Sequence, residues 1–258
     1  MLSSEMSSWS HRALRKHFLD AHVNDTESGT LDAVARMVLE IDRPDHVLHV
    51  GLRTLSAHLG AGRVDVGFGT AQQRTFSAAA EVSVSDDVPK MVGRALPNRH
   101  EVLQRVWHSA QPVAYDDVVN NPMVASLKEA FLECAAHAML AQRLSNDAGS
   151  FGVICIDDVE YGRVWRDCDR AYVYDFCTTF FAPLITISRQ IAEPDDIVKP
   201  SPSELDAIRL AAQGLSYKAI AATLNKSIRT IEAQLRSARH KTNTGNQTEL
   251  VRVCEPWL

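Results

Sequence analysis

The feature that most constrains this chain is a run of short amphipathic helices near its C-terminus, joined by very short turns. Within residues 201–254, three helical patterns each begin directly after a serine, whose hydroxyl can accept a hydrogen bond from a free amide of the first turn. At the first of these, Ser201-Pro202-Ser203-Glu204 adds a proline that suits the first helical position and a glutamate that can reach back to the cap. The three predicted caps are Ser201, Ser216 and Ser227.

The second and third of these predicted helices are separated by only Asn225-Lys226, so they must cross at a steep angle. The third helix, predicted over residues 227–240, has apolar side chains at helical spacing, which we expect to face inward: Ile228, Ile231, Leu235 and Ala238. Gly214 suits the left-handed end of the first helix, and residues 246–253 predict a fourth. This arrangement is typical of a helix-turn-helix that places one helix in a DNA groove.

The charge of this region fits a phosphate-bearing partner. Residues 201–258 contain eight Lys and Arg against five Asp and Glu, a net charge of +3, whereas the whole chain is −5, which leaves −8 for residues 1–200. A cationic segment on an acidic body indicates nucleic-acid contact by that segment alone. The alternative is a solvated helix face with an i,i+4 pair between Glu232 and Arg236, which stabilises a helix by a few tenths of a kcal/mol.

The same residues resemble the LuxR-type helix-turn-helix domain. The resemblance runs through Leu210-Ala211-Ala212-Gln213-Gly214-Leu215-Ser216-Tyr217 and Ser227-Ile228-Arg229-Thr230-Ile231-Glu232-Ala233-Gln234-Leu235-Arg236. In that family the third helix enters the major groove. The resemblance implies DNA binding by Lys218, Lys226, Ser227, Arg229, Thr230, Glu232, Ala233, Arg236 and Lys241, with Glu232, Ala233 and Arg236 at the base edges. It also implies a dimer contact on the fourth helix, for which Leu250 and Val253 are the candidates.

The chain departs from the family pattern at several positions. Ala219 stands where an acid is usual, Asn225 where glycine is frequent, and Thr242 where leucine is common. Glu232 could accept a hydrogen bond from a cytosine amine or orient Arg236. The base preference is therefore open, and we expect looser packing of the last two helices.

The remainder of the chain predicts a second domain. At 258 residues and 45% apolar content there is room for two cores. The polar, proline-punctuated residues 193–200 predict a linker. We therefore divide the chain into an N-terminal helical extension (1–30), a sensory domain (31–192), the linker, and the DNA-binding domain (201–258).

No signal segment or membrane-spanning apolar stretch is recognisable in the sequence, so we expect a cytoplasmic protein. The five cysteines are widely spaced and none forms a Cys-x-x-Cys pair, which argues against a disulfide framework and against a zinc site. His137 near Cys134 is too little for a metal or haem site. We predict neither cofactor nor metal.

Residues 31–192 mix helices and strands, which makes the fold class α+β. The patterns predict helices over 31–41, 45–59, 98–109, 123–134 and 166–191, the last bent at Pro183, and strands over 63–69, 75–84 and 112–115. Residues 137–144 and 151–156 predict an antiparallel hairpin. In the first strand, Val64, Val66 and Phe68 alternate with Asp65 and Gly67, which indicates burial on one face.

This order of elements, with Phe151-Gly152-Val153-Ile154-Cys155-Ile156-Asp157-Asp158 leading to Trp165 and a long helix, is similar to that of a GAF domain, a small-molecule sensory fold. The resemblance implies an antiparallel sheet with helices on one face and a ligand cavity on the other. The elements that border the cavity in such domains carry Trp107, Tyr115, Phe131, Met139 and Cys155, which are the candidate ligand contacts. Ordinary core packing is the competing interpretation of each.

The sequence therefore favours a DNA-binding transcriptional regulator, without enzymatic activity, that acts as a homodimer on two half-sites about 34 Å apart and responds to a small molecule. Three alternatives compete with this prediction: a front domain that binds an acyl-homoserine lactone, a phosphorylated receiver domain, and an enzyme with a DNA-binding tail. We recognise none of their motifs in the sequence. The lactone receptors have a characteristic spacing of Trp, Tyr and Asp, a receiver has an acidic pair, and an enzyme would need a phosphate loop or a nucleophile motif. Asp116-Asp117 and Asp157-Asp158 are explained more simply as strand ends and turns than as catalytic carboxylates.

Overall fold

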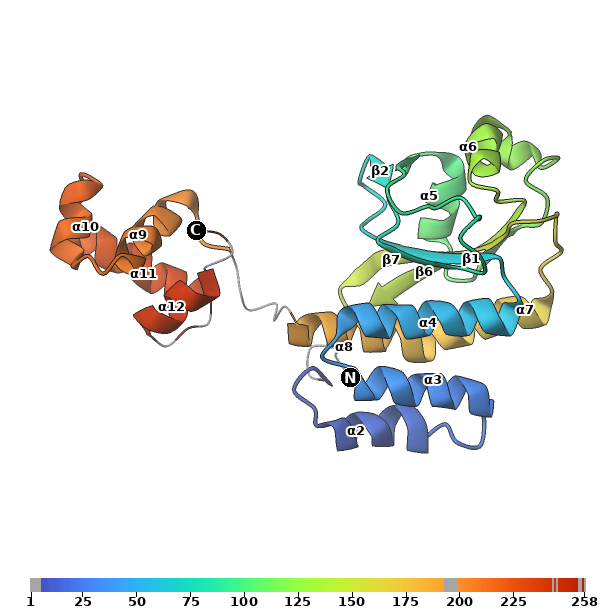
Figure 1. The fold of residues 1–258 in the computed structure, drawn as a ribbon, viewed down its shortest axis with the longest axis horizontal. Coiled ribbons are helices and arrows are strands. Elements are labelled where there is room, and N and C mark those ends of the chain that lie inside the picture. The colour runs from blue at the N-terminus through green and yellow to red at the C-terminus, as the bar shows by residue number, and fades with distance from the viewer. Residues whose placement is uncertain (1–5, 193–198, 243, 245, 255–256, 258) are drawn as a thin grey trace. The chain divides into compact units, whose positions relative to one another are not determined.

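The computed structural model describes residues 6–192, 199–242, 244, 246–254 and 257, and it divides the chain into two compact units, residues 1–192 and 193–258. We call them the front domain and the tail domain and treat each by itself (Figure 1). Residues 193–198, most of the predicted linker, lie outside the described residues.

The front domain is organised around a five-stranded sheet in which every neighbouring pair is antiparallel. The strand order is β3-β1-β7-β6-β5. The strands are β1 (Arg63–Phe68), β3 (Ala80–Ser83), β5 (Val113–Tyr115), β6 (Ala138–Asn146) and β7 (Gly149–Asp158). The predicted hairpin is confirmed, because β6 pairs with β7 from Ala138↔Asp158 to Asn146↔Gly149. A separate pair is formed by β2 (Thr75–Phe76) and β4 (Leu96–Pro97).

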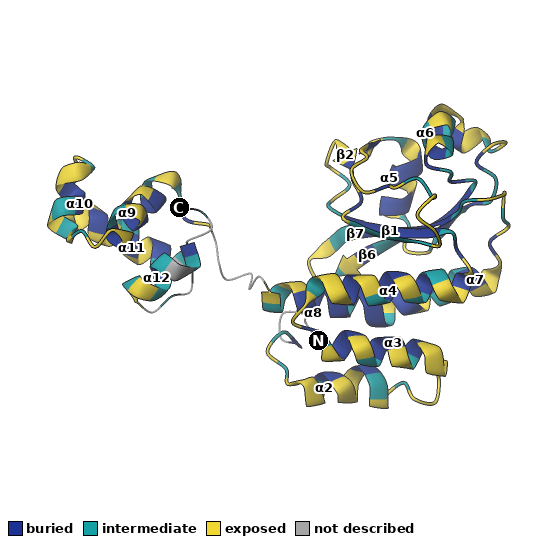
Figure 2. Cartoon of the chain, in the orientation of Figure 1, coloured by how far each residue is buried: buried dark blue, intermediate teal, exposed yellow. Residues whose placement is uncertain are grey.

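The prediction that β1 is half-exposed is wrong. Asp65 is 1% exposed, and every residue of β1 before Phe68 is buried. The sheet is covered on both faces, so the polar half of the alternation faces a second core rather than water (Figure 2).

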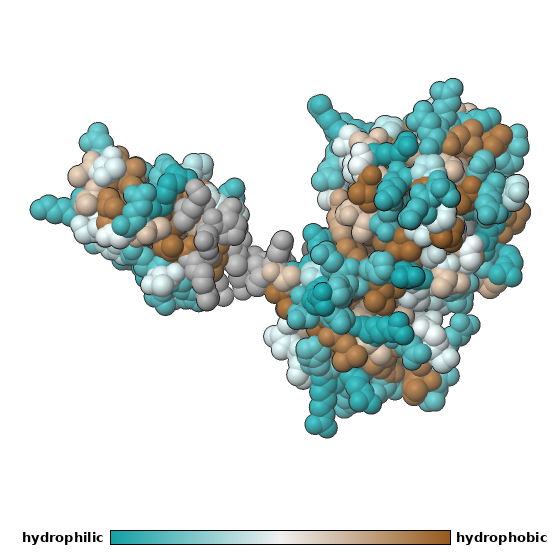
Figure 3. All heavy atoms as spheres, in the orientation of Figure 1, coloured by the Kyte–Doolittle hydropathy of each residue, from teal (hydrophilic) through white to brown (hydrophobic). Residues whose placement is uncertain are grey.

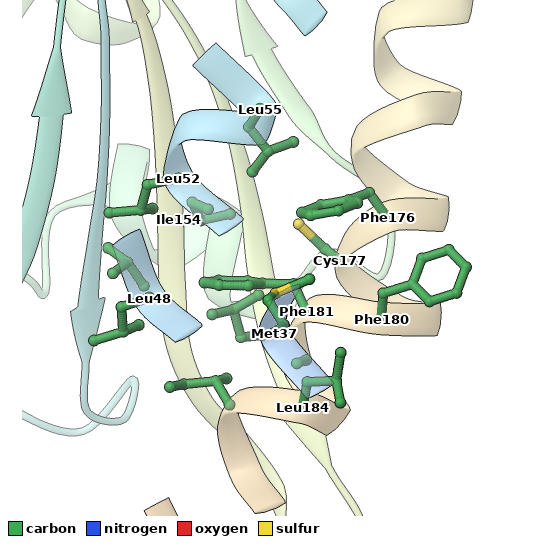
Figure 4. Close-up of a cluster of buried hydrophobic side chains, with 14 of the residues drawn as sticks. Met37, Leu48, Leu52, Leu55, Ile154, Phe176, Cys177, Phe180, Phe181 and Leu184 are labelled. Atoms are coloured by element: carbon green, nitrogen blue, oxygen red, sulfur yellow. The ribbon is translucent and has the colours of Figure 1, made fainter. Parts of the chain in front are cut away.

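Helices α3 (Ser28–Leu39), α4 (Pro44–Leu59), α7 (Asp167–Asp175) and α8 (Ala182–Ala192) form one side of the front domain. Their apolar faces meet Val64, Val66 and Ile154 of the sheet in a large core. Figure 4 shows Phe181 between the helices, beside Leu48 and Met37. A Cβ at Gly51 would stand 2.2 Å from Phe181, so only glycine lets the ring pack this closely against α4.

The predicted helix over 166–191 is unbroken over residues 167–192, but its type changes along its length. Residues Phe176–Phe181 form the π-helical segment η3 between α7 and α8, directly before Pro183. Proline has no amide hydrogen and its ring would collide with the carbonyl four residues earlier in a regular α-helix. A wider turn before Pro183 avoids that collision, as a π-bulge does.

The other face of the sheet carries α5 (Glu101–His108), the 3-10 helix η2 (Pro122–Leu127), α6 (Lys128–Glu133), β2 and β4 around a second core. Two predictions are corrected here. Residues 75–84 form two strands rather than one, and residues 123–134 begin as a 3-10 helix. The break lies between Phe76 and Ala80, and within it Ala79 N donates to Val66 O.

The described part of the N-terminal extension packs within the front domain. The short helix α2 (His11–Arg15) and the π-helical turn η1 (Lys16–Asp20) bury Leu14 and Phe18 in the same core as α3 and α4. Their apolar side chains thus contribute to the stability of the front domain.

The tail domain consists of α9 (Pro202–Ala212), α10 (Tyr217–Thr223), α11 (Ile228–Lys241) and α12 (Gln247–Cys254). All three predicted serine caps are confirmed: the Oγ atoms of Ser201, Ser216 and Ser227 accept the amides of Glu204, Ala219 and Thr230 at 3.4, 3.3 and 3.1 Å. Ser201 and Glu204 form the reciprocal capping box. Gly214 (φ 81°) has the predicted left-handed conformation, and so does Asn225 (φ 51°) in the helix-turn-helix turn.

The core of the tail domain contains Ile231, Leu235 and Ala238 from α11, as predicted. Ile228 is a correction, because it is 45% exposed and lies outside that core. It occupies the first position of α11, before the stripe that packs against the other helices. Figure 3 shows hydrophilic side chains interspersed with hydrophobic ones over the visible face of both domains.

Candidate nucleic-acid interface and buried acidic cavity

The exposed side of α11 brings together four of the predicted DNA-binding residues. Arg229, Glu232, Ala233 and Arg236 are exposed, whereas Ile231, Leu235 and Ala238 point into the domain. Residues at i, i+3, i+4 and i+7 share one face of a helix. The surface they form, which we call the recognition face, therefore presents two guanidinium groups and one carboxylate around a small side chain.

Glu232 and Arg236 do not pair, since no ion pair within 4.0 Å joins them in the described part of the tail domain. The alternative interpretation, a solvated helix face stabilised by an i,i+4 salt bridge, is therefore not supported by the structure. Both side chains remain available to a partner.

Ser227 and Thr230 lie at the N-terminal end of α11, and Lys218 lies at the N-terminal end of α10. Ser227 and Thr230 are exposed, and their hydroxyl oxygens are 2.8 Å apart. Lys218 is exposed on α10. Hydroxyls and amines at a helix N-terminus are suited to hydrogen bonds with phosphate oxygens.

Lys226 and Lys241, the other predicted phosphate contacts, are engaged within the domain. The Nζ atom of Lys241 donates to both carboxylate oxygens of Glu204 at 2.9 and 2.7 Å. That of Lys226 donates to Ser203 Oγ at 2.6 Å, and Gln234 Nε2 donates to the same oxygen at 2.6 Å. These contacts join α11 to α9 and so hold the recognition helix in place.

Glu204 is the centre of this network. It is 6% exposed, so burial tends to raise its pKa, but hydrogen bonds from Lys241 and from the backbone of Ser201 outweigh burial and lower the pKa to about 2. A carboxylate that is both a helix cap and an ion-pair partner stays charged over the physiological pH range.

The two predicted dimer residues differ in the structure. Leu250 is completely buried in the core of the tail domain, so its prediction as a surface contact is wrong for this conformation. Val253 is half-buried. The long helical region 166–191 places Phe176, Phe181 and Ile185 in the front-domain core.

The five predicted ligand contacts in the front domain do lie together. Trp107, Tyr115, Phe131, Met139 and Cys155 are all buried in the second core, on one face of the sheet. Trp107 Nε1 donates to Asn98 Oδ1 at 2.7 Å and the Tyr115 hydroxyl donates to Val102 O at 3.2 Å, so both serve the packing of α5. Phe131, Met139 and Cys155 line a small, largely buried cavity of about 10 Å³, the size of roughly one water molecule.

The cavity also contains a charged cluster that the sequence analysis missed. Arg63 pairs with Asp157 through short contacts from its Nε and Nη2 atoms, and its Nη1 donates to the carbonyls of Pro89 and Cys134 at 2.6 Å each. Asp65 lies beside them, and among the described residues neither of its carboxylate oxygens accepts a hydrogen bond. Burial raises the pKa of Asp65 well above its ordinary value, the charge of Asp157 adds to the shift, and Arg63 opposes it.

A signal for this cluster was present in the sequence. Arg63 and Asp65 are two residues apart on a strand and so point to the same face. The strand register places them opposite Asp157 and Cys155 of β7. The prediction that Asp65 faces water concealed the pattern.

The other acidic residues at strand ends are turn residues, as predicted. Asp117 Oδ1 accepts the amides of Val119 and Asn120, and Asp158 Oδ1 accepts those of Glu160 and Tyr161. Asp116 accepts the amide of Trp165 at 3.0 Å. Only Asp157 of these strand-end acids joins the cavity.

A larger hollow of about 670 Å³ opens between α3 and α4. Several of its polar groups pair with one another: Glu27 lies 3.4 Å from His58, and Thr30 Oγ1 is 2.9 Å from the hydroxyl of Tyr172, whose ring stacks on His58. It is more open to solvent and leaves no buried polar group unpaired among its lining residues, so we place the candidate ligand site at the smaller, more buried cavity instead.

Within the described residues, no group of three or more His, Cys, Asp or Glu side chains has the arrangement of a metal site. The five cysteines are not joined in disulfides, and burial raises the pKa of Cys155 well above its ordinary value. None of the described helices is long and apolar enough to span a bilayer.

Comparison with known proteins gives a separate result for the tail domain and for the front domain. Residues 201–254 match the family model "Bacterial regulatory proteins, luxR family", so the tail is a LuxR-type helix-turn-helix domain. No relative of the chain was found among curated proteins.

Solved structures resemble the front domain. One is residues 122 to 287 of a methyl-accepting chemotaxis protein (20% identity, 62% of this chain, 99% of that chain, TM-score 0.50). A second is a far-red-absorbing protein in its dark state with bound biliverdin (15% identity, 62% and 99%, TM-score 0.50). A third is a phycoerythrobilin-bound GAF domain from a cyanobacterial phytochrome (14% identity, 64% and 98%, TM-score 0.49). At these identities the likeness concerns the fold, and the front domain is GAF-like.

Proposed function

We propose that the chain is a DNA-binding transcriptional regulator that reads the major groove with α11. The observation that carries the proposal is the recognition face. Arg229 and Arg236 are exposed and unpaired within the described residues, on a helix whose opposite side is held by Glu204, Ser203 and the core. A rigid helix with free guanidinium groups suits recognition of guanine edges and phosphates.

We further propose that the front domain controls this binding by taking up a small molecule on the face of the sheet that carries α5 and α6. The GAF-like fold and the largely buried cavity with its unpaired carboxylate support a sensory role over an enzymatic one. An acyl-homoserine lactone remains an alternative hypothesis for the effector. Since ligand binding can shift an equilibrium only through a difference in affinity between two states, the ligand must favour one arrangement of the chain.

Binding as a homodimer is the third part of the proposal. LuxR-type domains that read two half-sites about one helical turn apart need two copies. Because Leu250 is internal, Val253 is the remaining candidate contact on α12. Light scattering of the full chain on an excess of its DNA site is expected to show two chains per site, and one chain per site would contradict the dimer.

The experiment begins with selection of bound fragments from genomic DNA, which supplies a site. Arg236→Ala is then expected to lower affinity about ten- to a hundredfold, roughly 1–3 kcal/mol, and to relax base preference at one position. Arg209→Ala is the matched control, because Arg209 is exposed in the same domain but bonded to Asp206 on α9. Unchanged affinity and preference in Arg236→Ala would refute the groove assignment.

A further inference from the structure

The cavity in the second core of the front domain is lined by two acidic groups and one basic group. Arg63 is bonded to Asp157, and this pair leaves Asp65 without a donor among the described residues. An unpaired carboxylate in a buried site is costly, since it loses its hydration without a replacing hydrogen bond. Sites of this kind are retained where the group has a partner that comes and goes.

The rest of the cavity wall is apolar. Phe76, Leu103, Phe131 and Met139 surround the carboxylate, and they come from β2, α5, α6 and β6. Such a wall suits the aromatic or alkyl part of a ligand, whereas the Asp65 carboxyl supplies one strong hydrogen-bond acceptor. An anion would be repelled by Asp65 and Asp157, and a neutral body without a donor would leave Asp65 unpaired.

One wall of the cavity is irregular backbone. Residues 84–95, which we call the cover segment, contribute Met91. Arg63 Nη1 donates to Pro89 O at 2.6 Å, and Glu81 Oε2 accepts the amides of Met91 and Val92 at 2.6 and 2.9 Å. The segment is also joined to the sheet by Val84 N, which donates to Gly62 O at 2.9 Å, and by a bridge between Val92 and Ala78, and Arg94 lies 3.7 Å from Glu133. Arg63 thus contacts both Asp157 and the cover segment.

We propose that the front domain binds a small organic cation, an amine or amidine on an aromatic or alkyl body, whose N–H groups donate to Asp65. This deepens the sensory role and rests on the proposed function. The cavity of about 10 Å³ is too small for such a molecule, so binding requires the cover segment to move outward. A cation beside Asp65 also lies close to Arg63, and repulsion between them weakens the hold of Arg63 on Pro89. The positive charge of the ligand thereby favours outward movement of the cover segment.

The test uses the full chain and three probes of one shape: 2-phenylethylamine, the neutral 2-phenylethanol and the anionic phenylacetate. Calorimetry is expected to give at least about tenfold tighter binding of the amine than of the alcohol, with no binding of phenylacetate. Equal binding of amine and alcohol, or absence of amine binding, would overturn the proposal without the need for any variant.

Asp65→Asn is expected to remove the preference for the amine while it leaves binding of the alcohol unchanged. Asp86→Asn, on the exposed part of the cover segment, is the matched control and is expected to retain the preference. Survival of the amine preference in Asp65→Asn would also overturn the proposal. Affinity for the selected DNA, measured on the same samples, separates the two proposals: intact DNA binding without amine preference removes only the ligand class, and amine preference without DNA binding removes only the regulator.

Discussion

The two domains treat buried charge in opposite ways. In the tail domain, the buried carboxylate of Glu204 is satisfied by Lys241 and by the backbone of Ser201, and Lys218, Arg229 and Arg236 are exposed. In the front domain, Asp65 is buried with no donor among the described residues. In the tail domain the polar contacts of Glu204 and Ser203 fix α11, whereas in the front domain the Asp65 carboxyl is buried without a hydrogen-bond donor among the described residues. This contrast is the one expected if, as proposed, the tail domain holds a fixed DNA-binding helix and the front domain responds to a ligand.

The largest effect is expected for Arg63→Met. The variant leaves the buried carboxylate of Asp157 without its partner and two carbonyls without their donor, which costs roughly 3–5 kcal/mol of the free energy of unfolding. Urea unfolding of the full chain measures it. The double variant Arg63→Met/Asp157→Leu is the control, and it is expected to recover much of the loss because an ion pair replaced by apolar groups costs little. A single variant as stable as the unmodified chain would contradict the buried pair.

Glu204→Ala tests the satisfied half of the comparison. It removes the capping box and the contact with Lys241, and since Lys241 is one-third exposed we expect a loss of about 2 kcal/mol. The pKa of Glu204 is lowered to about 2, so this contribution is present above its ordinary value of 4.5 and declines as the pH falls toward 2. Hydrogen exchange of residues 202–212 measures it, with Glu232→Ala as the exposed control. Equal protection in both variants would show that Glu204 does not hold α9.

Asp65→Asn is expected to act in the opposite direction. Because burial raises the pKa of Asp65, the unfolded chain releases its proton near the ordinary value of 3.8 while the folded chain retains it, so stability falls as the pH rises from there through the folded pKa. The groups that face Asp65 are Arg63, Asp157, Cys155 and Glu81. Asp65→Asn has no such titrating group, so its free energy of unfolding should exceed that of the unmodified chain by about 1–2 kcal/mol at pH 7 but not at pH 3.5. Thermal unfolding at the two pH values decides it, and a pH-independent difference would contradict the shift.

The smallest effect is expected at the turn of the helix-turn-helix. Asn225 has φ 51°, a conformation that glycine adopts without strain. Asn225→Gly is therefore expected to preserve the turn and change stability by less than about 1 kcal/mol, whereas Asn225→Val should destabilise it by more. Hydrogen exchange across α10 and α11 compares the two. Equal behaviour of the glycine and valine variants would argue against the left-handed turn.

The sequence predicted the tail domain more closely than the front domain, for local reasons. Caps such as Ser216 and Ser227 act on amides two or three residues away, so their roles can be recognised without knowledge of the fold. The exposure of Ile228 and the internal bonds of Lys241 depend on contacts from other helices and were not predictable in this way.

In the front domain the decisive facts are long-range. The apolar alternation of β1 was correct, but whether Asp65 meets water or a second core depends on α5 and α6, far along the chain. The pairing of Arg63 with Asp157 joins residues 94 positions apart. Strand pattern alone indicates which residues share a face, and only the register of β1 on β7 shows which charges meet.

The most direct test of the central claim is the affinity of the full chain for its selected DNA site, compared with the double variant Arg229→Ala/Arg236→Ala at one salt concentration. The account predicts a loss of at least about a hundredfold with unchanged hydrogen exchange in the tail domain, because both guanidinium groups are exposed and carry no part of the fold. A double variant that is folded and binds the site as tightly as the unmodified chain would contradict it.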